Sequence, residues 1–197
     1  MEFNHPPKDK RIRVSISGNI LSGRDFDSEK YYIRYYLDMP SNFVFEDPMS
    51  QKLITSTQMG TAVEITKEYE SYYEANFSFP FNFNCLCSNI TPMPKLFFQV
   101  TSKDFWDRYR VEGYGFIALP STPGYHNYTV NTWKPTGSIR NNLRSSFVGG
   151  STELRDLSYT AIPNGFEQHF LNKFGFATDP SGSISVCLNV IYHGDVN

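Results

Sequence analysis

The sequence predicts an all-β fold, an antiparallel β-sandwich with one short helix inserted before the last strands. Three observations predict it. Apolar and polar residues alternate along many short segments, which is the pattern of half-buried strands. Turn-forming Gly, Pro, Asn and Asp separate these segments at fairly regular spacing, as in sandwiches. Only one segment shows the period of an amphipathic helix.

The N-terminal part predicts two strands joined by a loop. Apolar and polar side chains alternate over Ile12–Ser17, so we expect a half-buried strand there. Gly18–Glu29 is rich in Gly, Ser and Asp and predicts a polar loop. Tyr31–Asp38 predicts the second strand, which ends before Pro40.

The middle of the chain predicts shorter or irregular strands. Leu53–Thr57 and Ala62–Thr66 are expected to be strands separated by a turn near Gly60. Phenylalanine recurs at every second position over Phe77–Phe83, which places the rings on one face of a strand. Because Pro80 cannot donate a ladder hydrogen bond, we expect an edge strand or a bulged one.

The C-terminal half predicts the remaining strands and the helix. Leu96–Val100 has one apolar face, and Val111–Pro135 predicts two strands joined by a hard turn. Ser138–Phe147 has helical periodicity with a serine N-cap, and Gly149-Gly150 ends it. Ile184–Val190 alternates most cleanly and predicts the last strand.

The length, net charge and cysteine count limit the kind of protein that this chain can be. We expect residues 1–10 to be a loose lead-in and 11–197 to form a single domain. The net charge of −2 gives no general attraction to nucleic acid, which is not an expected partner. Three cysteines are too few and too uneven for a disulfide framework and favour a reducing compartment. No signal peptide or long apolar run is evident.

Several long motifs carry a family resemblance. They are KDFWDRYRVEGYG, LPSTPGYH, TWKP, FVGGSTELRDLSY and SGSISVCLNVIY, and together they extend over roughly residues 11–192. These motifs resemble the B9 domain family, divergent C2-like β-sandwiches of ciliary proteins. FWDRYRVEGYG and GGSTELRDLSY resemble Meckel-type B9 proteins more than the two smaller B9 proteins.

The resemblance implies a function as well as a C2-like fold. It implies a noncatalytic interaction module of the cytoplasm at the ciliary base, in the transition zone and basal body. There it would assemble with the two smaller B9-domain proteins in a heteromeric complex that supports cilium formation and membrane gating.

The residues predict no catalytic site, metal site or cofactor. Cys85-Leu86-Cys87 lacks the spacing of a zinc site, and both thiols are expected to join the phenylalanine face as small core residues. The four histidines are scattered singly, without a nucleophile motif beside them. An enzyme is therefore not expected.

Calcium binding is also not expected, although many C2 domains bind it. Calcium requires six to eight oxygen ligands. Asp25 and Asp27 offer carboxylates, but Thr101 and Lys103 occupy the places where a calcium-binding C2 domain has aspartates. The two acids are alternatively solvated loop residues or caps of local turns.

Anionic phospholipid is the alternative ligand. Lys103, Arg108 and Arg110 predict a basic patch, with Phe105 and Trp106 as apolar wedges. The competing expectation is that the two aromatic rings plug the end of the sandwich while the charges pair locally.

The strongest candidate for a protein interface lies on the second strand. Tyr32, Arg34 and Tyr36 share one of its faces, and tyrosine with arginine is a composition typical of interfaces. The competing expectation is that the Phe43–Thr66 insertion covers this face. The edge of the Phe77–Phe83 strand is a further candidate for pairing with a partner strand.

Overall fold

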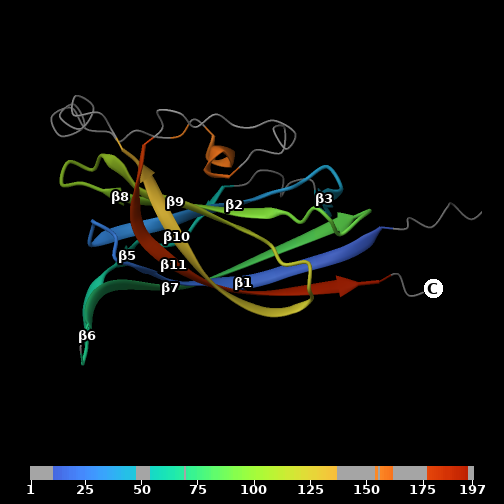
Figure 1. Ribbon diagram of the computed structural model, residues 1–197, viewed down its shortest axis with the longest axis horizontal. Coiled ribbons are helices and arrows are strands. Elements are labelled where there is room, and N and C mark those ends of the chain that lie inside the picture. The colour runs from blue at the N-terminus through green and yellow to red at the C-terminus, as the bar shows by residue number, and fades with distance from the viewer. Residues whose placement is uncertain are drawn as a thin grey trace, which may run out of the picture.

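The computed structural model describes residues 11–47, 54–68, 70–136, 154, 156–161 and 177–194, and these form a curled antiparallel β-sandwich (Figure 1). The predicted all-β antiparallel class is confirmed. The predicted lead-in at 1–10 and the predicted helix at 138–147 lie outside the described residues.

The first layer of the sandwich contains the longest strands. In hydrogen-bonded order it comprises β3 (Phe43–Phe45), β7 (Glu70–Cys87), β1 (Ile12–Arg24), β11 (Thr178–His193) and β10 (Gly124–Pro135). β6 (Val63–Lys67) pairs with the beginning of β7 and forms a hairpin that projects from the body (Figure 1). All of these pairings are antiparallel.

The second layer comprises β9 (Tyr109–Ala118), β8 (Lys95–Lys103), β2 (Lys30–Asp38) and β4 (Thr55–Ser56), with β5 (Gly60–Thr61) also paired to β2. The two layers are joined where Trp133 of β10 pairs with Tyr114 of β9. Between the layers, the Tyr31 ring lies 5.8 Å from the Phe77 ring, and Tyr35 contacts the other three phenylalanines of β7. Aromatic side chains therefore fill much of the core.

The predicted loop at 18–29 is too long, because β1 continues to Arg24 and only residues 25–29 connect it to β2. Gly18, which suggested a turn, is required by the packing of β1 against its neighbours. A Cβ atom at Gly18 would lie 2.3 Å from the Cys187 carbonyl oxygen and 2.7 Å from the tip of the Phe81 ring. Glycine at this position lets β1 pass close to its neighbours, so it belongs to a strand interior rather than a turn.

β7 is both bulged and partly at an edge, as the Phe77–Phe83 pattern predicted. Ile20 lies opposite Phe79, whereas Ser22 lies opposite Asn76, so β7 carries one extra residue between them. Ser78, within that bulge, has a left-handed φ of 46°. Of the predicted strands at 53–57 and 62–66, the first is only β4 and the second is β6.

The last strand has the predicted faces. Ile184, Val186, Leu188 and Val190 of β11 are each at most 1% exposed and point into the main core. Cys85 and Cys87 are fully buried in the same core, as predicted from their spacing after the phenylalanines.

A second, smaller hydrophobic cluster covers part of the outer face of the second layer. Its buried members are Val111, Tyr114 and Leu157. Leu157 begins the short 3₁₀ helix η2 (Leu157–Thr160), whose N-cap Asp156 accepts a hydrogen bond from Ser158 N at 2.9 Å. Leu154 N donates to Tyr114 Oη at 3.0 Å. Leu154 and residues 156–161, the covering segment, therefore pack on the sheet.

Candidate functional site

The most exposed aromatic side chains of the described chain lie in the loop between β8 and β9, which we define as the β8–β9 tip (residues 103–110). The tip lies at the opposite end of the long axis from the C-terminus (Figure 1). β8 and β9 are paired along almost their full lengths, so a continuous hairpin carries the tip.

Asp104 organises this tip through its main chain and its carboxylate. Trp106 N and Arg108 N donate to Asp104 Oδ1 at 2.9 and 3.0 Å, and Arg108 Nε donates to Oδ2 at 2.7 Å. Asp107 N donates to the Asp104 carbonyl oxygen at 3.0 Å, and Asp107 has a left-handed φ of 61°. The turn is thus fixed by the Asx geometry that aspartate favours.

Phe105 and Trp106 project into solvent from this turn. Phe105 is 94% exposed and Trp106 is 69% exposed. Their rings contact each other edge to face, with centroids 5.8 Å apart. The expectation that they plug the end of the sandwich is therefore wrong. The turn is closed by Asp104 rather than by apolar packing, so both rings remain outside the core.

The charges of the tip pair locally, as the competing expectation held. Lys103 Nζ lies 3.3 Å from Asp107 Oδ1, and this hydrogen bond raises the pKa of Lys103. Arg108 forms an ion pair with Asp104 and lies over the Trp106 ring, 4.7 Å from its centroid. Arg110 is exposed and has no ion-pair partner within the described ranges. The basic patch is therefore largely neutralised.

Desolvation raises the pKa of the Asp104 carboxyl group, but hydrogen bonds outweigh it. The main chain and guanidinium of Arg108 and the main chain of Trp106 donate to the carboxylate and hold its pKa below the usual value. Asp104 is consequently ionised whenever the domain is folded near neutral pH.

The three predicted interface residues do share one face of β2. Tyr32, Arg34 and Tyr36 alternate with the fully or nearly fully buried Tyr31, Ile33, Tyr35 and Leu37. All three are half-buried.

Tyr36 has packing partners that its strand did not predict. Its ring stacks on Phe97 with centroids 5.2 Å apart, and it joins the second cluster beside Trp133 and Leu154. Burial raises the pKa of Tyr36. The covering segment packs here. The described parts of the 43–66 insertion do not cover this face as expected, because they pair alongside β2 as β4 and β5 and alongside β7 as β3 and β6.

Asp25 and Asp27, the candidate calcium ligands, have other partners. Asp25 Oδ1 accepts a hydrogen bond from Tyr73 N at 3.1 Å. Asp27 forms an ion pair with Lys134. Across the described part of the chain, no group of three or more His, Cys, Asp or Glu side chains converges on one point.

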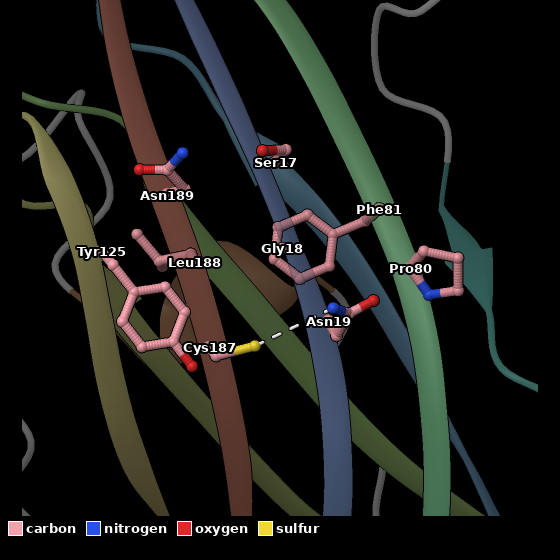
Figure 2. Close-up of a pocket in the computed structure, with 9 residues that line it drawn as sticks. All are labelled: Ser17, Gly18, Asn19, Pro80, Phe81, Tyr125, Cys187, Leu188 and Asn189. Carbon is pink, nitrogen blue, oxygen red and sulfur yellow. Dashed lines mark hydrogen bonds between the residues drawn. The ribbon is translucent and has the colours of Figure 1, made fainter.

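A shallow hollow of about 310 Å³ lies over Gly18, between β7, β1, β11 and β10 (Figure 2). Asn19 Nδ2 approaches Cys187 Sγ at 3.9 Å across its floor, and the Tyr125 ring flanks it. A hydrogen bond with Cys187 raises the pKa of Tyr125. The described lining residues carry no carboxylate, imidazole or ammonium group, and their titratable side chains are the Cys187 thiol and the Tyr125 phenol.

Two features of the tip were not predicted from the sequence. The first is the role of Asp104, although an aspartate that can accept a hydrogen bond from the main chain two residues later is a turn signal. The second is Tyr109, at the start of β9. It is 52% exposed, and Lys103 Nζ lies 5.2 Å from the centroid of its ring.

The described chain contains no helix long and apolar enough to cross a bilayer.

Comparisons with known proteins agree with the predicted resemblance. The B9-C2 family, described as "Ciliary basal body-associated, B9 protein", matches residues 14–191. Human Tectonic-like complex member MKS1 is 36% identical over 189 residues, which is 91% of this chain and 33% of that protein. The chain thus spans about a third of the length of the MKS1 relatives.

B9 domain-containing protein 2 is also similar. Human B9 domain-containing protein 2 is 40% identical over 142 residues, covering 72% of this chain and 75% of that protein. The bovine protein of the same name is 33% identical, covering 90% and 92%. Among solved structures, a C2 domain of plant extended synaptotagmin 1 matches with a TM-score of 0.43 at 10% identity, covering 96% of this chain and 99% of that one. On the family match, this chain belongs to the B9 domain family of ciliary basal body-associated proteins.

Proposed function

We propose that this chain is a noncatalytic interaction module that assembles with other B9-domain proteins. In this proposal it acts at the ciliary base, in the transition zone and basal body, and supports cilium formation and the gating of membrane proteins. The observation that carries the proposal is the family match over 14–191, with relatives of two kinds. One of them, human MKS1, is named as a member of a complex.

The state of the described reactive groups supports a noncatalytic role. Cys85 is fully buried, and desolvation raises the pKa of its thiol to about 12. A thiol with so high a pKa is almost entirely protonated near neutral pH and is a poor nucleophile. His126, at the start of β10, lies 3.0 Å from the Thr122 carbonyl oxygen and stacks on Tyr128. Both groups serve the fold.

The outer face of β2 is the proposed contact surface. Tyr32 and Arg34 are half-buried side chains on a rigid strand, so they lose little conformational entropy when a partner covers them. Tyr36, which packs under the covering segment, would support this surface from within. Tyr and Arg are the residue types that most often dominate binding energy at interfaces.

Calorimetric titration of this chain with a B9 domain-containing protein 2 tests the proposal. We expect binding, and we expect Arg34→Glu to weaken it about tenfold or more. Lys67→Glu, the same charge reversal on the exposed β6 hairpin, is the matched control and should bind as the wild type does. Absence of binding by the wild-type chain would overturn the assembly proposal. An equal loss in both variants would overturn the choice of surface.

A further inference from the structure

The β8–β9 tip combines two features that the assembly proposal does not use. Phe105 and Trp106 are the two most exposed large aromatic side chains in the described chain. They lie on one turn between β8 and β9, and their rings contact each other. Exposed rings of this size are unfavourable in water and are retained where they meet an apolar phase or a partner.

Four main-chain N–H groups of the tip are already paired within the loop. The N–H groups of Asp104, Trp106, Asp107 and Arg108 all donate within the loop. In the apolar part of a bilayer, an unsatisfied N–H group costs several kcal/mol. A protein groove can supply acceptors to unpaired donors, whereas the hydrocarbon of a bilayer cannot, so a tip with paired donors meets the stricter requirement of a bilayer. This observation favours a membrane over a protein pocket as the phase that receives the rings.

The charges near the rings also fit a bilayer interface. Arg108 lies over the Trp106 ring, and Lys103 lies near the Tyr109 ring. Aromatic rings with adjacent Lys and Arg are the typical composition at the level of lipid headgroups. Because Asp104 and Asp107 neutralise two of the three cations, electrostatic attraction to anionic lipid is weak here.

We propose that the β8–β9 tip inserts Phe105 and Trp106 into the interfacial layer of a lipid bilayer, with Arg110 at the level of the phosphates. Insertion of apolar rings, rather than headgroup charge, supplies most of the binding. Binding therefore requires neither calcium nor an anionic lipid, and an anionic lipid strengthens it only modestly. This surface is separate from Tyr32 and Arg34, so the inference does not depend on the proposed assembly.

Vesicle sedimentation of the whole chain tests the inference. Phosphatidylcholine vesicles, with and without phosphatidylserine and with EDTA present, are the probes. We expect the wild type to sediment with both and the Phe105→Ser/Trp106→Ser double variant to lose binding about tenfold or more. Tyr125→Ser removes a 65% exposed aromatic ring from β10, outside the tip, and should bind as the wild type does.

Tryptophan fluorescence gives the depth of insertion. In a Trp133→Phe background, Trp106 is the only tryptophan, and its emission should shift to shorter wavelength and be quenched by brominated lipid. Three results would overturn the inference. In the first, the wild type does not sediment with vesicles. In the second, the wild type binds only anionic vesicles, and the double variant binds them equally well. In the third, the wild type does not bind vesicles, and the double variant loses binding to the B9 partner. Partner titrations with the same variants separate failure of this inference from failure of the assembly proposal.

Discussion

Asp104 and Arg108 hold the β8–β9 loop closed through hydrogen bonds that run in both directions between them. Asp104 N donates to the Arg108 carbonyl oxygen at 3.0 Å, while Arg108 N and Nε donate back to the two carboxylate oxygens of Asp104 at 3.0 and 2.7 Å. This reciprocal pairing orders a short loop whose two aromatic side chains stay exposed. The order of the tip, and hence the orientation of Phe105 and Trp106, should depend on one carboxylate.

Replacing that carboxylate should loosen the tip alone. Asp104→Ala removes the acceptor for Trp106 N, Arg108 N and Arg108 Nε. We expect the amides of Trp106 and Arg108 to exchange with solvent much faster, because their protection comes from this group. Amides of β8 and β9 should keep their protection. Hydrogen exchange followed by NMR measures both, and unchanged exchange at Trp106 would contradict the role of Asp104.

The tip should also respond to acid with a definite sign. Hydrogen bonds hold the pKa of Asp104 below its usual value of about 3.9. A depressed folded-state pKa stabilises the fold above the unfolded pKa, and this contribution is lost as the pH falls through the folded value. An NMR titration of the side-chain carboxyl carbon should give a midpoint below about 3.9. A midpoint at or above that value would contradict the observed hydrogen bonds.

Gly18 should be the least replaceable glycine in β1. Gly18→Ala puts a methyl group 2.3 Å from the Cys187 carbonyl oxygen and 2.9 Å from Leu188 Cα, and neither main-chain atom can move away easily. We expect the free energy of unfolding to fall by about 2 kcal/mol or more. Gly194→Ala is the control, because its new Cβ would meet no atom within 4 Å. Urea denaturation compares the two, and equal stabilities would show that β1 and β11 separate without cost.

The faces of β11 give a second stability test. Val186 is 1% exposed in the main core, so Val186→Asp should bury an unpaired charge and cost about 4 kcal/mol or more. Ser185, its neighbour, points to the opposite, half-buried face, and Ser185→Asp should cost far less. Circular dichroism melting of both variants is the measurement. A cooperatively melting Val186→Asp protein beside an unfolded Ser185→Asp protein would mean that the faces are reversed.

Tyr36 and Arg34 should behave differently although they lie on one face. Tyr36 stacks on Phe97 and packs in the second cluster, so Tyr36→Ala should lower the free energy of unfolding by about 2 kcal/mol. Arg34→Glu should leave the melting temperature nearly unchanged. Thermal melting measures the difference. A drop of the same size in both would place Arg34 in the fold rather than at a partner surface.

Local patterns predicted most of the sandwich. Alternation gave the faces of β2, β7 and β11, and Pro80 correctly indicated an irregular edge strand. The pattern failed at Gly18, because a glycine required by a close approach of strands has the same local signature as a glycine in a turn. Only the partner strands distinguish these two cases.

The candidate sites depended on contacts far apart in the sequence. Alternation placed Tyr36 on an outer face, but the covering segment that packs there comes more than a hundred residues later. The exposure of Phe105 and Trp106 followed from how Asp104 closes the turn, and the same aromatic residues would fit a buried plug equally well. Residue types alone therefore identified the tip but not its state.

Light scattering of this chain mixed with a B9 domain-containing protein 2 is the first test of assembly between B9 domains. We expect a single species whose mass is that of a heteromeric complex. Arg34→Glu should separate this complex into its components, and Lys67→Glu should not. Two independent species with the wild-type chain, at concentrations where both proteins are folded, would mean that the two B9 proteins do not assemble.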